Sequence, residues 1–464
     1  MSKRLFIQTV GCQMNVLDSE LVVAGLLEAG YELVDSPRKA DTILFNTCSV
    51  RQHAEDKIYS ALGRLRPLKE QHPETIIGVL GCMAQKDQAT ILRRASHVDL
   101  VVGPGQLSRL PQLLAEVAAD RQARVEVSLD RRGGGRADVA ESFVKFDPPR
   151  TARTRAVAHQ AMVRIMFGCD KFCSYCIVPQ VRGPEQSRPA AEIEAEVRRL
   201  AADGCVEVTL LGQTVNSYKD TTSGPAIRLS DLLVRLHDID GLRRLKFVTN
   251  YPRHMTDDLL QAVRDLPKVS PYLHVPAQSG SDAVLHRMKR GYTAESYREM
   301  MERIRQTVPG AAVTSDFIVG FCGETEEDFQ QTADLVRWAR FKNSFIFKYS
   351  ARPGTRAAEL YPDDVPEDVK RRRNNELLAI QNAISLEDNG PILGRRVEVL
   401  VEGPSKTARK QAADSGGPAQ LVGRTVCDRI VVFDGPAELA GKILPIEIER
   451  IDAFTLFGRV AENP

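Results

Sequence analysis

The first 115 or so residues alternate between short apolar runs and longer amphipathic stretches. The apolar runs RLFIQTV, DTILFNT, TIIGVLG and VDLVVG predict strands. Helical patterns follow the first three of them, starting near residue 18 and covering roughly 52–70 and 83–95. Because regular strand–helix alternation is typical of a parallel α/β sheet, we predict an N-terminal open parallel α/β domain over residues 1–125.

Residues 126–160 are polar, contain Gly and Pro, and interrupt this pattern, so they are predicted to form a linker. The alternation then resumes with six apolar runs separated by helical patterns. The predicted strands are VRIMF, VEVTLLG, LKFVT, YLHVP, AVTSDFIVG and SFIFKYS. Six consecutive β/α units indicate a partial (β/α)6 barrel over residues 161–388, since a closed barrel of this type has eight.

The pattern of apolar and polar residues changes in the last part of the chain. A charged helix over roughly 366–388 leads to a break at Asp388-Asn389-Gly390-Pro391. Only short strand patterns follow, namely RRVEVLVE, QLVGRTV, RIVVF, KILPIEIERI and TLFGRV. Short strands at regular spacing predict a small β-barrel over residues 391–464.

Composition agrees with a folded chain of several domains. At 464 residues the chain has room for about three domains of roughly 150 residues. Its hydrophobic fraction of 43% and charged fraction of 27% are ordinary for a globular protein. No apolar run approaches the roughly 20 residues of a membrane span, and the N-terminus lacks a signal-peptide pattern. We therefore expect a cytoplasmic protein.

The net charge of +2 gives no general affinity for nucleic acid, so RNA binding would need a local basic patch. Arg150, Arg153 and Arg155 form one candidate patch. A solvated linker explains these three arginines equally well.

The chain has nine cysteines and no recognisable export signal. An odd number of cysteines in such a chain argues against a disulfide framework. Cys12, Cys48 and Cys82 each follow a predicted strand and precede a predicted helix. The turns after parallel strands lie along one edge of a sheet, so these cysteines are expected to converge there. Nearby helix N-termini favour the thiolate form. The alternative is three inert core thiols, which free cysteines often are.

Three further cysteines, Cys169, Cys173 and Cys176, have the spacing C-x3-C-x2-C on one loop. A structural zinc site needs a fourth ligand, for which His274 is a candidate. A [4Fe–4S] cubane has four iron corners, so three thiolates leave one iron open to another ligand. The spacing after the first barrel strand resembles the signature of radical S-adenosylmethionine (SAM) enzymes.

That resemblance implies SAM as cofactor and a set of SAM-contacting positions at the ends of the barrel strands. Tyr175 matches the aromatic residue beside the last cysteine, and Gln213 matches the position that receives the SAM amino group. DFIVGFCGETEEDF resembles the G-x-I-x-G-x-x-E motif, whose glycines allow close approach to the adenine. The predicted cofactor-binding residues are Tyr175, Gln213, Gln278, Ser279, Gly320, Gly323 and Glu324.

Nearly the whole chain resembles the methylthiotransferase family, which joins an N-terminal cluster domain, a radical SAM domain and a C-terminal TRAM β-barrel. The matching blocks include GCQMNVLDSE, NTCSVRQHAEDK, GCMAQ, GCDKFCSYCIVPQVRGPEQSR and PAQSGSDAVLHRMKRGY. The resemblance implies two [4Fe–4S] clusters, one held by Cys12, Cys48 and Cys82 and the other by Cys169, Cys173 and Cys176. Catalytic residues beyond these ligands are not identified from the sequence.

GCQMN and NTCSVRQHAEDK most resemble the MiaB-type branch of the family. The implied reaction is radical SAM-dependent methylthiolation of carbon 2 of N6-isopentenyladenosine at position 37 of tRNAs. Other branches modify a ribosomal-protein aspartate or threonylcarbamoyladenosine in tRNA, and both remain alternatives. A non-catalytic, zinc-stabilised RNA-binding protein is the alternative from another class.

The implied partners are the tRNA anticodon loop and an electron donor such as a flavodoxin-type protein, and we expect a monomer. From Pro391 onward ten Lys/Arg are balanced by ten Asp/Glu, so RNA binding by this domain requires charge segregated onto one face. Arg371, Arg372 and Arg373 either add to such a face or form a solvated helix surface. Cys205, Cys322 and Cys427 match no ligand position and are expected to be structural thiols.

Overall fold

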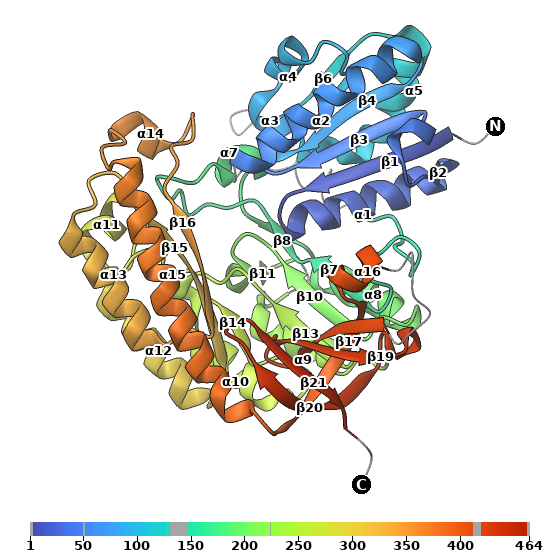
Figure 1. Ribbon diagram of the computed structural model, residues 1–464. Helices are drawn as coiled ribbons and strands as arrows, with labels where there is room; N and C mark the ends of the chain where they lie inside the picture. The colour runs from blue at the N-terminus through green and yellow to red at the C-terminus, as the bar shows by residue number, and fades with distance from the viewer. Residues whose placement is uncertain are drawn as a thin grey trace.

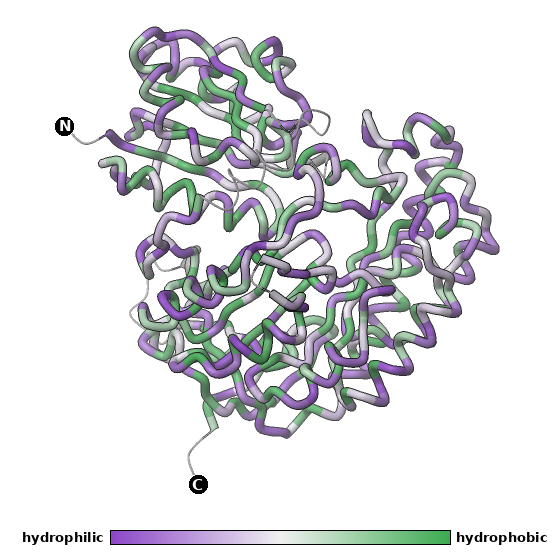
Figure 2. The backbone as a smooth tube through the Cα atoms, turned by 180° about the vertical axis from the view of Figure 1, so that it is seen from behind, coloured by the Kyte–Doolittle hydropathy of each residue, from purple (hydrophilic) through white to green (hydrophobic). Residues whose placement is uncertain are grey.

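The computed structural model describes residues 3–49, 52–127, 129, 146–222, 224–411 and 419–461. Figure 1 shows an N-terminal α/β domain above a central barrel, with a small C-terminal barrel beside the central strands. The strands of the two larger domains are mostly hydrophobic along the tube in Figure 2, as expected for sheets covered by helices.

The N-terminal domain is a six-stranded sheet in the order β2-β1-β3-β4-β5-β6, with every pair parallel. Its strands are β1 (Lys3–Val10), β2 (Tyr31–Leu33), β3 (Thr42–Thr47), β4 (Ile76–Gly81), β5 (Leu100–Val102) and β6 (Arg124–Glu126). Its helices are α1 (Gln13–Glu28), α2 (Gln52–Gln71), α3 (Cys82–Asp87), α4 (Ala89–Arg94) and α5 (Leu110–Asp120). β3 and β4 are buried along their whole length, which explains their uninterrupted apolar sequence.

Two helix predictions in this domain were wrong in detail. α1 begins at Gln13 and not near residue 18, because Cys12 and Asn15 form a capping box that starts the helix one residue after the cysteine. The helix predicted over 83–95 is divided into α3 and α4 at Gln88, whose φ of 47° interrupts the helical backbone. The short edge strands β2 and β6 were not predicted.

The central domain contains the six predicted strands in two parallel three-stranded sheets, β7-β10-β13 and β14-β15-β16. A bridge between Leu245 and Val269 links the first sheet to the segment before β14. The strands are β7 (Gln160–Arg164), β10 (Glu207–Leu211), β13 (Arg244–Phe247), β14 (Tyr272–His274), β15 (Ala312–Val319) and β16 (Asn343–Lys348). The prediction of a partial barrel is confirmed.

Helices cover the outer face of this barrel, as Figure 1 shows for α12, α13 and α15. They are α8 (Ala190–Ala202), α9 (Leu229–His237), α10 (Asp257–Asp265), α11 (Asp282–Arg287), α12 (Ala294–Thr307), α13 (Glu326–Ala339), α14 (Arg356–Leu360) and α15 (Glu367–Asn389). The largest hydrophobic core of the protein, with Phe247, Phe317 and Phe341 fully buried, lies between these helices and the strands. Two further strands, β11 (Lys219–Asp220) and β12 (Ile227–Arg228), form a small antiparallel pair.

The C-terminal domain is a closed five-stranded barrel in the order β17-β18-β19-β21-β20, as predicted. Its strands are β17 (Arg396–Pro404), β18 (Ala419–Thr425), β19 (Ile430–Gly435), β20 (Ile443–Ile451) and β21 (Thr455–Val460), and one short helix is α16 (Lys406–Gln411). Asp428, in the turn after β18, lies 3.0 Å from Lys246 Nζ of the central barrel and accepts a hydrogen bond from Lys342 through its carbonyl. Arg244 Nη2 lies 3.2 Å from Glu398 Oε1. Ion pairs made by two buried cations, Arg244 and Lys246, therefore attach this domain to the central barrel.

The predicted linker lies partly outside the described residues, but its described end, 146–159, shows no helix or strand. Both interpretations of its arginines were wrong for Arg150 and Arg155. Arg150 is buried and forms ion pairs with Glu20 of α1 (2.9 Å) and Glu196 of α8 (2.6 Å). Arg155 pairs with Asp203 at 2.8 Å. Arg150 therefore joins the N-terminal and central domains, and neither side chain is available to RNA.

Among the described helices, none has both the length and the apolar character needed to cross a membrane.

Candidate functional site

Cys12, Cys48 and Cys82 lie together at the carboxyl edge of the N-terminal sheet. The strand register aligns Val10 with Thr47 and Thr47 with Gly81, the last residues of β1, β3 and β4. The three cysteines come one or two residues after these aligned positions. The convergence predicted from the parallel pattern is therefore confirmed.

Two buried asparagines hold this edge together. Asn15 Oδ1 accepts from the backbone N–H of Cys12 and lies 3.3 Å from its Sγ. Asn15 Nδ2 donates to Asn46 Oδ1 at 3.1 Å, and Asn46 Nδ2 donates to the Asn15 carbonyl at 2.9 Å. Gly81 has a φ of +90°, and a Cβ there would lie 2.3 Å from Asn46 Oδ1. The cysteine-bearing turns are thus fixed by short polar side chains and one obligatory glycine.

The thiols of this group, hereafter the N-terminal trio, have distinct environments. A hydrogen bond with Cys48 lowers the pKa of Cys12 to about 6. Cys48 and Cys82 are buried, while Cys12 is exposed. Burial raises the pKa of Cys82, and the Arg182 guanidinium, whose Nε donates to Cys82 Sγ at 3.2 Å, opposes that shift. One member is therefore open to solvent and the other two are held inside the protein.

Cys169, Cys173 and Cys176, hereafter the barrel trio, lie on the loop between β8 (Met166–Phe167) and α7 (Val178–Arg182). β8 pairs with β9 (Gln186–Ser187) and so closes the base of this loop. Cys169 N donates to the Gly183 carbonyl at 3.1 Å, and Cys176 N donates to the Cys173 carbonyl at 3.0 Å. Short backbone bonds therefore fold three cysteines into one compact loop.

Burial raises the pKa of Cys169 to about 11 and that of Cys176 to about 12. Because metal ligands must be deprotonated, a cluster held by this trio would release protons on assembly, and its iron would supply the positive charge that keeps the thiolates ionised.

Gly168, directly before the barrel trio, has a φ of +70°, and a Cβ at this position would lie 1.9 Å from the Pro184 carbonyl oxygen. We expect Gly168→Ala to lower the free energy of unfolding by more than the roughly 1–2 kcal/mol of left-handed strain alone, and to reduce iron binding. Gly204→Ala is the matched control, since Gly204 has a φ of +82° with no atom within 4 Å of the added carbon. Urea denaturation of both variants measures the difference, and equal losses would contradict the expectation.

The barrel trio, like the N-terminal trio, is contacted by a buried arginine. Arg290 Nη1 lies 3.3 Å from Cys173 Sγ and 3.5 Å from the Tyr175 hydroxyl, while its Nε donates to the Tyr292 hydroxyl at 2.8 Å. The Tyr175 ring packs edge-on against Phe321, with ring centroids 6.5 Å apart. Arg290 therefore connects a cysteine sulfur to Tyr175, one of the predicted cofactor-binding residues.

The zinc alternative has no support in this geometry. Across the described ranges, no group of three or more His, Cys, Asp or Glu side chains is arranged to hold a metal ion. His274, the candidate fourth ligand, is engaged elsewhere: its Nδ1 lies 3.0 Å from Thr314 Oγ1 and its Nε2 lies 3.4 Å from Asp316 Oδ2. Each thiolate of a cubane binds its own iron corner, so its cysteines need not crowd around a single point as zinc ligands do. The chemistry of two cysteine trios fits two such clusters.

The predicted SAM contacts lie at the ends of the barrel strands. Gln213, beyond β10, has a buried Oε1 without a hydrogen-bond partner in the described structure, which suits an acceptor for an ammonium group. Gln278 has a φ of 70° and its carbonyl accepts from Ile318 N. The Ser279 hydroxyl lies 3.1 Å from Thr332 Oγ1 and accepts from Ser281 N at 3.1 Å, and its role in cofactor binding stays a prediction.

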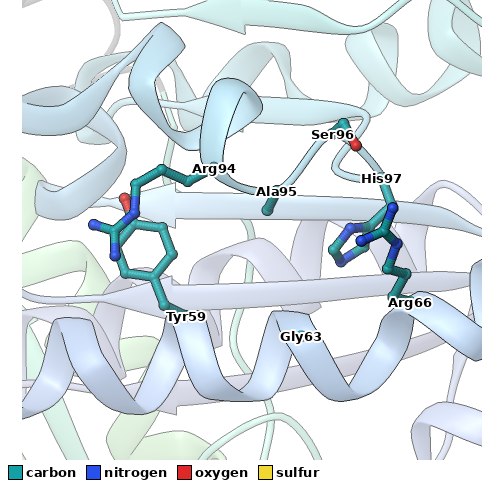
Figure 3. Close-up of a pocket in the computed structure, with 7 residues that line it drawn as sticks. All are labelled: Tyr59, Gly63, Arg66, Arg94, Ala95, Ser96 and His97. Atoms are coloured by element: carbon teal, nitrogen blue, oxygen red, sulfur yellow. The ribbon is translucent and has the colours of Figure 1, made fainter.

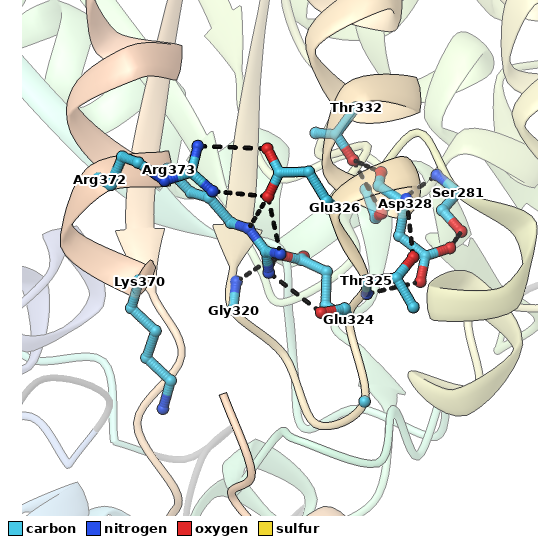
Figure 4. A network of polar contacts seen from close by, with 12 residues as sticks. Ser281, Gly320, Glu324, Thr325, Glu326, Asp328, Thr332, Lys370, Arg372 and Arg373 are labelled. Atoms are coloured by element: carbon cyan, nitrogen blue, oxygen red, sulfur yellow. Dashed lines mark hydrogen bonds and ion pairs between the residues drawn. The ribbon is translucent and has the colours of Figure 1, made fainter. Parts of the chain in front are cut away.

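The motif after β15 is braced by α15 (Figure 4). Glu324 Oε1 accepts from Gly320 N at 2.7 Å and from Arg373 Nη1 at 2.8 Å, which fixes the turn that carries Gly320 and Gly323. Arg372 Nη2 and Arg373 Nη2 lie 2.5 Å and 3.1 Å from Glu326 Oε2. Arg373 is buried, so the interpretation of these arginines as a solvated or RNA-binding face was wrong for Arg373. Glu324 thus shapes the backbone of the predicted SAM site.

Burial raises the pKa of Glu324 from its ordinary 4.5 to about 7. The folded state then binds a proton that the unfolded state has released, so stability falls as pH rises from about 4.5 to about 7. The loss is on the order of 2–3 kcal/mol. We expect Glu324→Gln, which keeps the acceptor oxygen, to flatten this decline in urea denaturation curves at pH 5 and 7.5. Glu327→Gln, at an exposed position in the first turn of α13, should leave the decline unchanged; equal pH profiles for the two variants would refute this role.

The three remaining cysteines lie outside both trios. Cys205 is fully buried, with Sγ 3.1 Å from the Glu207 carbonyl, and Cys322 is buried in an aromatic cluster with Phe321 and Tyr349. Cys427 Sγ lies 2.9 Å from Arg429 Nη1. Their positions agree with the expectation of structural thiols.

A cavity of about 210 Å³ lies between α2 and the end of α4, lined by Tyr59, Gly63, Arg66, Arg94, Ala95, Ser96 and His97 (Figure 3). None of the predicted site residues lines it. Arg94 stacks 3.7 Å from the centre of the Tyr59 ring, so the cavity is bordered by a cation–π pair and not by the cysteine-bearing turns.

Comparison with known proteins agrees with this three-part organisation. Residues 4–103 match the Uncharacterized protein family UPF0004, residues 163–336 match the Radical SAM superfamily, and residues 392–461 match the TRAM domain. Among solved structures, the radical SAM methyltransferase TsrM from Kitasatospora setae superposes with a TM-score of 0.54 at 15% identity, covering 77% of this chain and 74% of that one. The fold and the two cysteine trios define a radical SAM protein.

Full-length relatives are much closer in sequence. The tRNA-2-methylthio-N(6)-dimethylallyladenosine synthase of Rhodopirellula baltica is 58% identical over 460 residues, which cover 99% of this chain and 96% of the relative. Proteins of the same name from Syntrophotalea carbinolica and Neisseria gonorrhoeae are each 42% identical and cover 96% and 99% of this chain. The chain belongs to the family of tRNA-2-methylthio-N(6)-dimethylallyladenosine synthases, a branch of the methylthiotransferases.

Proposed function

We propose that the protein is a transferase that methylthiolates carbon 2 of N6-isopentenyladenosine at position 37 of tRNAs in a radical SAM-dependent reaction. The observation that carries this proposal is 58% identity over almost the whole chain to a synthase named for this product. The placement of six cysteines as two trios supports it independently, because this chemistry requires two separate centres.

The N-terminal trio and the barrel trio are the proposed ligands of two [4Fe–4S] clusters, and SAM is the proposed cofactor at the strand ends of the barrel. When bound, these groups supply the methylthio sulfur and the radical chemistry at a carbon whose C–H bond has no acidic proton. The protein binds and orients them: six thiolates hold iron, Gln213 offers a buried acceptor to the SAM ammonium group, and Glu324 fixes the turn of Gly320 and Gly323. Tyr175, Gln278 and Ser279 complete the proposed SAM contacts.

The proposed domain boundaries are 1–125, 161–388 and 391–464, with a linker over 126–160. The C-terminal TRAM barrel is proposed to bind the tRNA anticodon loop. The equal numbers of basic and acidic residues in this domain are a smaller obstacle to RNA binding than the sequence suggested. Two of the acidic residues, Glu398 and Asp428, pair with Arg244 and Lys246 of the central barrel. We further propose a flavodoxin-type electron donor, a monomeric state and a cytoplasmic location, where tRNA is found.

Nucleoside profiling tests the substrate. A strain lacking its own methylthiotransferase, complemented with this chain, is expected to regain 2-methylthio-N6-isopentenyladenosine in its tRNA. A Cys176→Ala version of the chain should not restore it. If the wild-type chain leaves N6-isopentenyladenosine unmodified but methylthiolates a ribosomal protein or threonylcarbamoyladenosine in tRNA, the proposed substrate is wrong.

Metal analysis tests the cofactors. The anaerobically reconstituted protein is expected to bind about eight irons in two cubanes and to show iron–sulfur absorption in the visible range. Zinc alone at either trio would contradict the proposed radical chemistry.

A further inference from the structure

A buried arginine lies between the two cysteine trios. Arg182 ends α7, the short helix that begins two residues after Cys176. Its side chain is 3% exposed and crosses into the N-terminal domain, where its Nε donates to Cys82 Sγ at 3.2 Å. One residue of the barrel-trio loop therefore contacts a ligand of the N-terminal trio.

The surroundings hold this guanidinium in place. Its Nη2 lies 2.7 Å from Asp18 Oδ2 of α1, and the Asp18 carboxylate, which is fully buried, also faces Arg164 Nη1 at 3.8 Å. Ile177 and Val181 of the same segment pack directly against Cys82. Contacts on three sides thus fix the position of the arginine relative to the sulfur.

These contacts do not use every hydrogen-bond donor of the Arg182 guanidinium. Arg182 Nη1 is buried and has no hydrogen-bond partner in the described part of the chain. A buried donor without a partner is costly, and it is expected to face a group that binds there in the functional protein. A cluster ligated by three thiolates and carrying sulfide is the negatively charged group that this site is proposed to receive.

We infer that Arg182 is a positioning residue of the cluster held by the N-terminal trio, and that it raises the reduction potential of that cluster. Hydrogen bonds to ligand sulfurs withdraw negative charge from a cluster, so they stabilise its reduced, more negative state. The same side chain orients the Cys82 thiolate and couples the turn after β4 to the loop of the barrel trio. This inference rests on the proposed function, because it requires an iron–sulfur cluster at the N-terminal trio.

Redox titration of the full-length, reconstituted protein tests the inference. The signal of the N-terminal cluster in electron paramagnetic resonance is assigned by its loss in Cys82→Ala. In Arg182→Met we expect its midpoint potential to move to more negative values. We also expect the methylthiolated product to fall roughly 10-fold or more, while 5′-deoxyadenosine release continues near the parent rate. An unchanged potential overturns the inference.

Arg150→Met is the matched control. Arg150 is equally buried and also joins α1 to the central domain, but its guanidinium pairs with the carboxylates of Glu20 and Glu196 and not with a sulfur of either trio. We expect it to lower the stability of the domain interface and to leave the cluster potential at the parent value. If Arg150→Met shifts the potential as much as Arg182→Met does, the effect comes from domain packing and the inference is wrong.

Two further variants keep the test decisive if Arg182→Met fails to fold. Arg182→Met combined with Asp18→Asn removes both charges of the buried pair and should retain the negative shift, whereas a parent potential in this double variant refutes the inference. Arg182→Lys keeps the charge and should recover part of the shift. The potential is measured without tRNA, so it remains informative even if the RNA substrate proposed above is wrong.

Discussion

Cys176→Ala is expected to abolish reductive cleavage of SAM completely. Cys176 is the last ligand of the barrel trio, its backbone is bonded to Cys173, and two residues later the chain enters α7. Without this thiolate the cubane loses one of only three protein anchors, and the open iron that is proposed to bind SAM is no longer held. Anaerobic assays should detect no 5′-deoxyadenosine, and bound iron should fall from about eight to about four per chain.

Cys427→Ala is the control for this variant, because Cys427 is another partly exposed thiol that lies in the C-terminal barrel and outside both trios. It should retain the full iron content and SAM cleavage. Residual 5′-deoxyadenosine formation in Cys176→Ala at the parent rate would show that the barrel trio does not hold the radical-forming cluster.

Cys48→Ala is expected to block sulfur insertion while leaving SAM cleavage intact. Cys48 directly follows β3, is 3% exposed, and interacts with Cys12, so it belongs to the N-terminal trio and to no part of the barrel. Its removal should release about four irons but leave the barrel cluster loaded. Product analysis should therefore find 5′-deoxyadenosine without any 2-methylthio nucleoside.

Cys205→Ala is the appropriate control for Cys48→Ala, since it removes an equally buried thiol whose Sγ lies 3.1 Å from the Glu207 carbonyl and outside both trios. It should lose some stability through the small cavity it creates, with both products unchanged. Equal loss of 5′-deoxyadenosine in Cys48→Ala and Cys176→Ala would argue against two separate cluster roles.

Local sequence patterns were sufficient for the architecture. The fully buried strands β3 and β4 read as unbroken apolar runs, and six further runs located the strands of the central barrel. Because the chemistry of parallel sheets gathers at strand ends, the same patterns also predicted that Cys12, Cys48 and Cys82 converge. Each of these inferences depends on residues that are neighbours in the chain.

Contacts between distant parts of the chain were not predictable in this way. Arg182 and Cys82 are separated by 100 residues, and Arg150 and Glu20 by 130. The sequence around an arginine looks the same whether its side chain is solvated or buried against a carboxylate. For this reason the interpretation from sequence was wrong for Arg150, Arg155 and Arg373. The segments GCQMN and NTCSV offered one usable signal, since each places an asparagine within three residues of a cysteine, and Asn15 and Asn46 bond to each other.

The ion pairs beneath the central barrel have a consequence for substrate selection. Lys246 of the central barrel pairs with the Asp428 carboxylate and Lys342 donates to the Asp428 carbonyl, so the C-terminal domain is attached to the barrel at this turn. If the C-terminal domain binds RNA, this attachment sets the distance between the bound nucleotides and the reactive base. An RNA in which that distance is different can then bind without placing its base where the reaction occurs.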